Sequence, residues 1–299
     1  MTMNLIPIAD CHLHLWNLER NPYPWLRAAE PSGPFGKTAK IRHSYLLHDY
    51  LNDTAQQNVV KAVHVEAGWD HDDPVGETRW LQQLADQHGF PQGIVAHADL
   101  ASPHVEATLE QHAQCANLRG IRMRLQDGNF VSSPDNGNER LRSASWRRGF
   151  SLLRKFNLSF DLQATSNAMH DGAQIAASFP DTPIIVTHAG YPLDPSPVER
   201  ERWRRGMREL ASHENVFVKL SGVTMGRPDW TVDEIAPVTL EVIDLFGVAR
   251  CLFASNFPVD RLFGSFDRLF GAYRSIVIGF STDEQRALFH DNTCRVYRI

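Results

Sequence analysis

Leu5-Ile6-Pro7-Ile8-Ala9-Asp10-Cys11-His12-Leu13-His14 is an apolar run that ends in a His-x-His pair, and we expect a β-strand over residues 5–13. Residues two apart on a strand point to the same face, so His12 and His14 project together from the end of this strand. Two neutral imidazoles side by side form half of a transition-metal site. In a chain with 14 histidines, the pair indicates a metal only if other polar side chains join it.

Short apolar runs alternate with longer amphipathic segments along the rest of the chain. The further expected strands cover 59–65, 93–98, 118–123, 158–162, 183–187, 216–220 and 250–254. The expected helices cover 44–57, 74–88, 104–115, 140–156, 167–179, 197–213, 232–246 and 266–278. A last helix is expected to start at an N-cap Thr282, with Gln285 in the capping-box position, and to end near Cys294.

Strict alternation implies parallel strands joined by crossover helices, and eight such units in 299 residues fit one (β/α)8 barrel domain over 1–299. A doubly wound sheet is the alternative, although no glycine-rich phosphate loop follows the first strand. Segment 17–43 is rich in Pro, Gly and charge, and we interpret it as a lid or pocket wall rather than a passive surface loop. Trp16, Tyr23 and Trp25 would supply apolar contacts there.

Composition excludes several functional classes. A hydrophobic content of 42% and a charged content of 22% are ordinary for a soluble protein, and a net charge of −5 argues against nucleic acid or an anionic membrane as partner. No apolar run has the length of a membrane span, and the N-terminus lacks signal-peptide features. Four widely spaced cysteines indicate reduced thiols in the cytoplasm. We expect a small-molecule substrate, and the sequence leaves open whether the chain forms a homo-oligomer.

Polar side chains end each expected strand, where a barrel carries its chemistry. In chain order these are His12 and His14, His64 and Glu66, His97 and Asp99, Arg122 and Arg124, Asp161 and Gln163, His188, Lys219, and Asn256. Burying such groups costs free energy unless they bind one another or a ligand. A functional site at this end of the barrel is therefore expected.

His188 follows the strand-like run Ile184-Ile185-Val186 and is the best third metal ligand, with a hydrogen-bonded core histidine as the alternative. Glu66 is a further ligand, a contact to a substrate hydroxyl, or the partner of an arginine. For His170, which follows strand five, a position in the pocket stays open. The remaining helix and loop histidines are expected at the surface: His43, His48, His71, His88, His104, His112, His213 and His290.

Arg122 and Arg124 lie two apart and would face the same way on a strand. Guanidinium groups bind carboxylates bidentately, so the pair indicates an acidic substrate or a developing oxyanion. The alternative is an ion pair with Asp161 or Asp99. Lys219 likewise either contacts an acidic substrate or a developing oxyanion, or forms an ion pair within the protein.

Five strand-end motifs, at 10–16, 120–122, 187–190, 218–222 and 253–258, and the ending at 291–297 occur in a specific order and spacing. In these residues the chain resembles the amidohydrolase superfamily of TIM barrels. Within it, the chain is most similar to the amidohydrolase-2 branch, which contains 2-pyrone-4,6-dicarboxylate lactonase, sulfomuconolactonase and sugar-acid lactonases. The resemblance covers almost the whole chain and implies hydrolysis at a carbonyl, or decarboxylation or hydration in related branches.

In metal-dependent members of this superfamily, strand-one histidines hold a divalent ion, and a strand-eight aspartate acts as ligand and general base. Here Asn256 occupies the matching position, and an amide takes up no proton at neutral pH. Asp161 and Gln163 stand where the superfamily carries a strand-five lysine or histidine ligand. The resemblance therefore implies a mononuclear site or no metal.

The hypothesis from the sequence is a lactonase that opens a small acidic or sugar-acid lactone. His12, His14 and His188 would hold one divalent ion, by preference zinc. The other assigned residues are Arg122 and Arg124 as a carboxylate or oxyanion clamp, Lys219, Gln163 and Trp16 as substrate contacts, and Asn256 in a catalytic role. His188 would transfer the proton without a metal, and Glu66 or Asp260 with one. A decarboxylase or hydratase of the same superfamily, or a non-catalytic ligand-binding barrel, are the alternatives.

Overall fold

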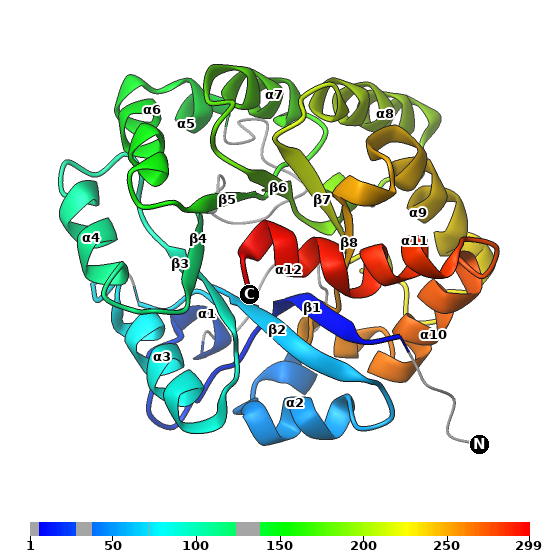
Figure 1. Cartoon of the computed structure of the whole chain (residues 1–299), viewed down its shortest axis with the longest axis horizontal. Coiled ribbons are helices and arrows are strands. Elements are labelled where there is room, and N and C mark those ends of the chain that lie inside the picture. Colours follow the sequence, from blue (N-terminus) through cyan, green and yellow to red (C-terminus); the bar gives the residue numbers. More distant parts are fainter. Residues whose placement is uncertain (1–5, 28–37, 71, 124–137) are drawn as a thin grey trace.

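Parallel strands form the centre of the fold and follow one another around it in chain order (Figure 1). The computed structural model describes residues 6–27, 38–70, 72–123 and 138–299. The strands are β1 (Ile8–Leu13), β2 (Val59–Val65), β3 (Gly93–His97), β4 (Leu118–Arg122), β5 (Ser159–Leu162), β6 (Ile184–Val186), β7 (Val216–Leu220) and β8 (Cys251–Phe253). A parallel bridge between Leu13 and Phe257 brings the last strand back to the first. The predicted (β/α)8 barrel is confirmed.

Helices connect successive strands on the outside of the barrel. They are α2 (Leu47–Asp53), α3 (Gly76–His88), α4 (Val105–His112), α5 (Asn138–Arg142), α6 (Ala144–Ser151), α7 (Met169–Ser178), α8 (Pro197–Ala211), α9 (Val232–Phe246) and α10 (Phe266–Ile276). The single helix predicted over 140–156 is wrong. Ser143 has an extended backbone (φ −62°, ψ 131°) and separates α5 from α6.

The C-terminal segment forms α11 (Thr282–Arg286), a π-helical turn (Ala287–Asp291) and α12 (Asn292–Tyr297). Its N-cap is Ser281, one residue before the predicted Thr282. The Ser281 hydroxyl accepts a hydrogen bond from the Glu284 backbone N–H at 3.2 Å, and the Glu284 carboxylate accepts one from the Ser281 N–H at 2.9 Å. A carboxylate is a stronger acceptor than the amide of Gln285, which favours this start of the helix.

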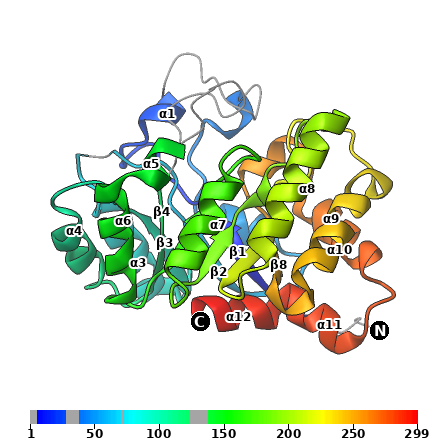
Figure 2. The same ribbon diagram turned by 90° about the horizontal axis from the view of Figure 1, so that it is seen from above.

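The N-terminal end of the barrel is closed by α12, and Figure 2 shows α12 at the end of the barrel opposite to α1 (Pro24–Arg27). Tyr297 is fully buried and packs with one cluster of apolar side chains: Cys11, Val63, Val65, Val95, Ile185, Leu252 and Ala254. Its hydroxyl donates a hydrogen bond to Asp161 Oδ1 at 2.8 Å. Because this end is filled, the polar strand ends gather at the other one.

The described parts of segment 17–43 pack beside those strand ends. The Tyr23 hydroxyl donates to Glu77 Oε1 at 3.1 Å, and Trp25 Nε1 donates to the Ala67 carbonyl at 2.6 Å. Tyr23, directly before α1, is thus bonded to α3, and Trp25 of α1 to a residue shortly after β2. The interpretation of the segment as a lid or pocket wall stays a prediction. Within the described ranges, no helix has the length and apolarity to cross a membrane.

Candidate active site

His12 lies on β1, and the strand end that carries it is held by Asp10. The buried Asp10 carboxylate accepts hydrogen bonds from the His12 N–H at 3.2 Å, the Ser255 N–H at 2.9 Å, the Ser255 hydroxyl at 2.6 Å and the Tyr50 hydroxyl at 3.0 Å. Four donors satisfy the carboxylate without any cation. Asp10 therefore ties the end of β1 to the residues that follow β8.

His12, His14 and His188 lie together at the C-terminal end of the barrel. The ring centroid of His12 is 5.0 Å from that of His14 and 4.5 Å from that of His188. Burial lowers the pKa of all three imidazoles well below the usual range, and nearby cationic groups such as Arg122 and Lys219 lower it further. The three rings are therefore neutral, which is the state in which imidazole binds a metal or accepts a proton.

Hydrogen bonds orient two of the three rings. His14 Nδ1 lies 2.7 Å from the Val65 carbonyl, so Nδ1 carries the proton and Nε2 keeps its lone pair. His188 Nδ1 lies 2.8 Å from the Ser221 hydroxyl. Such bonds on the second ring nitrogen are typical of metal-ligating and catalytic histidines. Ser221 was not assigned a role from the sequence, although it lies in the quoted strand-seven motif.

His12 differs from these two, because both of its ring nitrogens are buried and have no hydrogen-bond partner in the described part of the chain. An unpaired buried nitrogen costs free energy, so His12 is chemically suited to a ligand. As the side chains stand, no three His, Cys, Asp or Glu residues in the described ranges are arranged to hold an ion. The three imidazoles are thus chemically suitable as metal ligands, but their side chains are not arranged as in a formed metal site.

Two residues of the site have a left-handed backbone. His188 has φ 53° and Asn256 has φ 59°. For a residue other than glycine this conformation costs about 1–3 kcal/mol and persists where the surroundings enforce it. Gly222 lies against the His188 ring, because a Cβ there would be 2.9 Å from its Cγ and Nδ1 atoms. The backbone is therefore fitted closely around the imidazole cluster.

Asn256 follows β8 and lies next to the backbone of β1. Its N–H donates to the His12 carbonyl at 2.8 Å, and its side-chain Nδ2 donates to Asp260 Oδ1 at 2.7 Å. Burial raises the pKa of Asp260 to about 7, against hydrogen bonds from Asn256, the Gly222 N–H and Thr224 that lower it. A carboxyl group that titrates near neutrality thus lies directly behind the amide.

Arg122 and Glu66 form a buried ion pair. Arg122 Nε donates to Glu66 Oε1 at 2.8 Å, and its Nη2 donates to the Glu66 carbonyl. The side chains are 4% and 2% exposed. The arginine's partner is thus Glu66, as one interpretation of the sequence has it, and neither Asp161 nor Asp99 pairs with it. Arg124, the other half of the predicted clamp, lies outside the described residues.

Glu77 is a buried carboxyl group close to this ion pair, and no sequence pattern indicated a role for it. It accepts hydrogen bonds from Tyr23 and from the Ala67 N–H. Burial, with the nearby Glu66 carboxylate, raises its pKa to about 8, whereas these hydrogen bonds and Arg122 oppose the shift. Between about pH 4.5 and pH 8, the folded state therefore keeps a proton on Glu77 that the unfolded chain has released.

This proton makes stability depend on pH. The unfolded chain releases it near pH 4.5 and the folded state near pH 8, so the free energy of unfolding falls as pH rises between these values. We expect Glu77→Gln to remove about 2–5 kcal/mol of this fall, because glutamine stays neutral and keeps an acceptor oxygen. Urea unfolding of both proteins at pH 5 and pH 8 measures the difference. An equal fall in both contradicts the assignment.

The remaining predicted substrate contacts are all buried. Lys219 Nζ lies 2.6 Å from Asp161 Oδ2, with both side chains fully buried in the barrel. Gln163 Nε2 donates to the Tyr191 hydroxyl at 2.9 Å. Trp16 Nε1 donates to the His43 carbonyl at 2.8 Å, and its ring stacks on that of His14 at a centroid distance of 6.4 Å. The structure thus brings Gln163 and Trp16 to the margin of the cluster and gives Lys219 an anionic partner.

Two other histidines differ in their placement. His170 is 60% exposed and bonds to Glu209 at 2.7 Å, so it does not reach the cluster. The expectation of a surface position is wrong for His112, which is fully buried between the Thr78 hydroxyl and the His97 carbonyl, each at 2.9 Å. The others are exposed (His43, His48, His88, His104), half-buried (His213, His290) or outside the described residues (His71).

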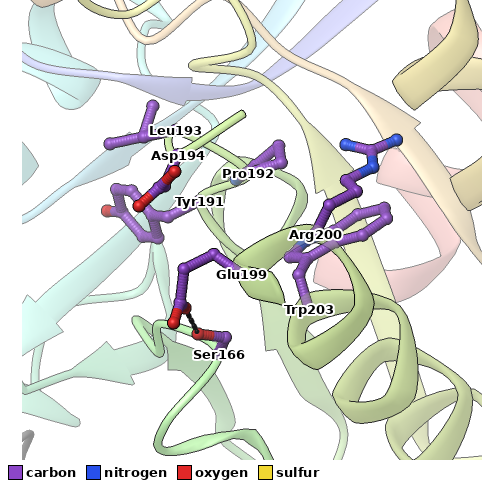
Figure 3. A pocket seen from close by; sticks show the side chains of 8 residues that line it. All are labelled: Ser166, Tyr191, Pro192, Leu193, Asp194, Glu199, Arg200 and Trp203. Carbon is purple, nitrogen blue, oxygen red and sulfur yellow. Dashed lines mark hydrogen bonds between the residues drawn. The ribbon is translucent and has the colours of Figure 1, made fainter. Parts of the chain in front are cut away.

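A hollow with an empty volume of about 250 Å³ lies beside the cluster. Figure 3 shows its lining: Ser166, Tyr191, Pro192, Leu193, Asp194, Glu199, Arg200 and Trp203. The Ser166 hydroxyl donates to Glu199 Oε2 at 3.2 Å. Tyr191 connects the hollow to the cluster, because its ring lies 5.0 Å from that of His188. The hollow therefore neighbours the imidazoles but does not contain them.

The family model described as amidohydrolase matches residues 9–299. The chain belongs to the amidohydrolase family. It is 45% identical to the uncharacterized protein y4mH of Sinorhizobium fredii, over 99% of this chain and 100% of that protein. It is also 28% identical to an L-fucono-1,5-lactonase of Burkholderia ambifaria, over 97% and 95% of the two chains.

Solved structures of this family share the fold. A Burkholderia multivorans amidohydrolase with bound zinc superposes with a TM-score of 0.83 at 24% identity, and the match covers 98% of this chain and 99% of that one. At this identity the likeness shows the fold. The match to the family model confirms the predicted resemblance to the amidohydrolases.

Proposed function

We propose that this amidohydrolase is a lactonase that opens a small lactone at the C-terminal end of its barrel. The observation that carries the proposal is the cluster of three buried, neutral imidazoles of His12, His14 and His188. The L-fucono-1,5-lactonases of Burkholderia ambifaria and Burkholderia multivorans, 28% and 26% identical, support a sugar-acid lactone as the substrate. Hydrolysis of such a ring needs a base for water and a donor for the developing oxyanion.

In the protein without a metal, His188 fits the part of the base. When its Nδ1–H donates to the Ser221 hydroxyl, Nε2 is free to take a proton from water. Arg122 fits the part of the donor, because its hydrogen bonds to Glu66 hold the guanidinium, with its five N–H groups, in place at the end of β4. Trp16, stacked on His14, supplies an apolar wall that limits the access of bulk water.

A single divalent ion, by preference zinc, belongs to this proposal as a cofactor. His12, His14 and His188 would hold it, and the two unpartnered nitrogens of His12 support the assignment. When bound, such an ion lowers the pKa of water and polarises a carbonyl. With such an ion on Nε2 of His188, this imidazole would be a ligand and no longer the base. Asn256 takes up no proton and Glu66 is held by Arg122, so the lowered pKa of the water would take the place of that base.

The decisive experiment is hydrolysis of L-fucono-1,5-lactone and related sugar-acid lactones by the purified protein, with and without added zinc. We expect acid release well above the spontaneous rate, which a protein-free sample measures. A parallel assay for carbon dioxide release from hydroxybenzoic acids tests the decarboxylase alternative. No hydrolysis of any lactone under either condition would contradict the proposal.

The expected partners and location are part of the same proposal. The substrate is a small molecule, and neither nucleic acid nor a membrane is required. All four cysteines are free, which supports a reducing compartment such as the cytoplasm. Gel filtration of the purified chain decides whether it forms the homo-oligomer that the sequence leaves open.

A further inference from the structure

Asn256 and Asp260 form a closed hydrogen-bonded unit after β8. The Asp260 N–H donates to the Asn256 carbonyl at 3.0 Å, and Asn256 Nδ2 donates back to Asp260 Oδ1 at 2.7 Å. Both side chains are 2% exposed. Asp260 lies on a short 3-10 helix (Val259–Leu262), so its carboxyl group is fixed relative to the strand end. The amide of Asn256 therefore has one preferred orientation.

That orientation decides which chemistry the strand-eight position offers. Asp260 Oδ1 accepts the hydrogen bond from the NH2 end of the amide, which turns the amide oxygen away from Asp260. The ionised carboxylate only accepts hydrogen bonds and so enforces this orientation. The oxygen accepts up to two hydrogen bonds and donates none. The Asn256 backbone N–H bonds to the His12 carbonyl, so Asn256 lies next to the strand end that carries His12.

Resting on the proposed lactonase function, we infer that Asp260 is a positioning residue that presents the amide oxygen of Asn256 to a substrate hydroxyl. The substrate class is then a hydroxylated lactone, whose hydroxyl hydrogens need an acceptor. A planar dicarboxylate lactone has no such donor in its ring. Asp260 acts through Asn256 and does not touch the substrate itself.

The ion pair between Arg122 and Glu66 supports the same substrate class. Two of the arginine's donors are already bound to Glu66, and both side chains are buried. Among the described residues, a substrate carboxylate at this place would meet an arginine whose charge Glu66 already offsets, so it would lose hydration for little electrostatic gain. Together the two observations favour a neutral, hydroxyl-bearing ring over a dicarboxylate.

The test compares two lactones with the same six-membered ring, L-fucono-1,5-lactone and the hydroxyl-free δ-valerolactone. The wild type is expected to favour the hydroxylated ring in kcat/KM. In Asp260→Asn the new side chain can turn either its oxygen or its NH2 group toward Asn256, so the amide of Asn256 loses its fixed orientation and this preference falls by about tenfold, the value of one hydrogen bond. Asn256→Ala, which lacks the acceptor, is expected to lose the preference to the same extent and replaces Asp260→Asn if that variant does not fold.

The matched control is Thr224→Val. Thr224 donates to the other oxygen of Asp260, Oδ2, at 3.5 Å, and not to the oxygen that accepts from the amide. This variant is expected to lower the melting temperature slightly and to keep the wild-type preference. If Asp260→Asn and Thr224→Val keep the same preference as the wild type, Asp260 has only a structural role and the inference is overturned.

A second readout does not depend on activity. In an NMR spectrum of the whole protein, the Nδ2 protons of Asn256 are expected to exchange slowly with solvent and to do so faster in Asp260→Asn; Asn256→Ala identifies the signal. Equal exchange in the wild type and Asp260→Asn overturns the inference. If the wild type hydrolyses no lactone, the proposed function fails by itself, while this measurement still decides the orientation of the amide.

Discussion

Replacing His188 with asparagine is expected to lower kcat/KM for lactone hydrolysis by about 10²- to 10⁴-fold, the usual contribution of a positioned acid or base. Asparagine suits this position because it tolerates the left-handed backbone at φ 53°. Its amide can also keep a hydrogen bond to Ser221, so the fold should be preserved. Steady-state kinetics and circular dichroism measure the two effects separately.

The matched control is His170→Asn. His170 is an exposed histidine on α7 that bonds to Glu209, away from the cluster. Its replacement removes an imidazole from the molecule without touching the site, and we expect kcat/KM to stay within about twofold. Should His188→Asn keep wild-type kinetics while folding normally, the imidazole cluster would not be the place of the chemistry.

The position of the site was predictable because it depends on strand periodicity. His12 and His14 lie at the end of β1 and directly after it, and His188 follows β6 by two residues, so a parallel barrel brings all three to one end. The substitution of Asn256 for a carboxylate is likewise visible in the sequence. These inferences need only the strands and their order.

The pairing of the charged residues could not be predicted from the sequence. Several acidic residues end neighbouring strands, and only register and side-chain conformation bring Glu66, rather than Asp161, to Arg122. The contact between Asp161 and Tyr297 joins residues that are 136 positions apart. No local pattern indicates such a contact, since it arises when α12 closes the barrel.

The N-cap of α11 and the burial of His112 could not be predicted from the sequence either, for physical reasons. Ser281 and Thr282 are both good N-caps, and the reciprocal bond with Glu284 decides between them. His112 lies on a helix face that the sequence assigns to solvent, but Thr78 of the neighbouring helix α3 supplies a partner that makes its burial tolerable.

Lys219→Met is expected to have the largest effect on stability, lowering the free energy of unfolding by about 3–5 kcal/mol. Methionine fills much of the same space but leaves the Asp161 carboxylate buried without its cation, 2.6 Å from where Nζ lay. The Tyr297 hydroxyl alone then faces this charge. Urea unfolding followed by fluorescence measures the loss.

The double variant Lys219→Met/Asp161→Asn separates the ion pair from the fit of the side chains. Asparagine removes the unpaired charge and keeps an acceptor for Tyr297, so the double variant should be more stable than Lys219→Met alone. Lys155→Met is the matched control, because Lys155 pairs with Glu106 at the surface and its loss should change stability by less than about 1 kcal/mol.

The same variants decide between the two interpretations of Lys219. If Lys219 serves the fold, its replacement lowers the free energy of unfolding. The KM of the folded variant then stays close to that of the wild type at temperatures well below unfolding. If Lys219 binds substrate, its replacement raises KM instead, and the variant unfolds at the same urea concentration as the wild type. Because Asp161 already holds the ammonium group inside the barrel, with both side chains fully buried, we expect the first result.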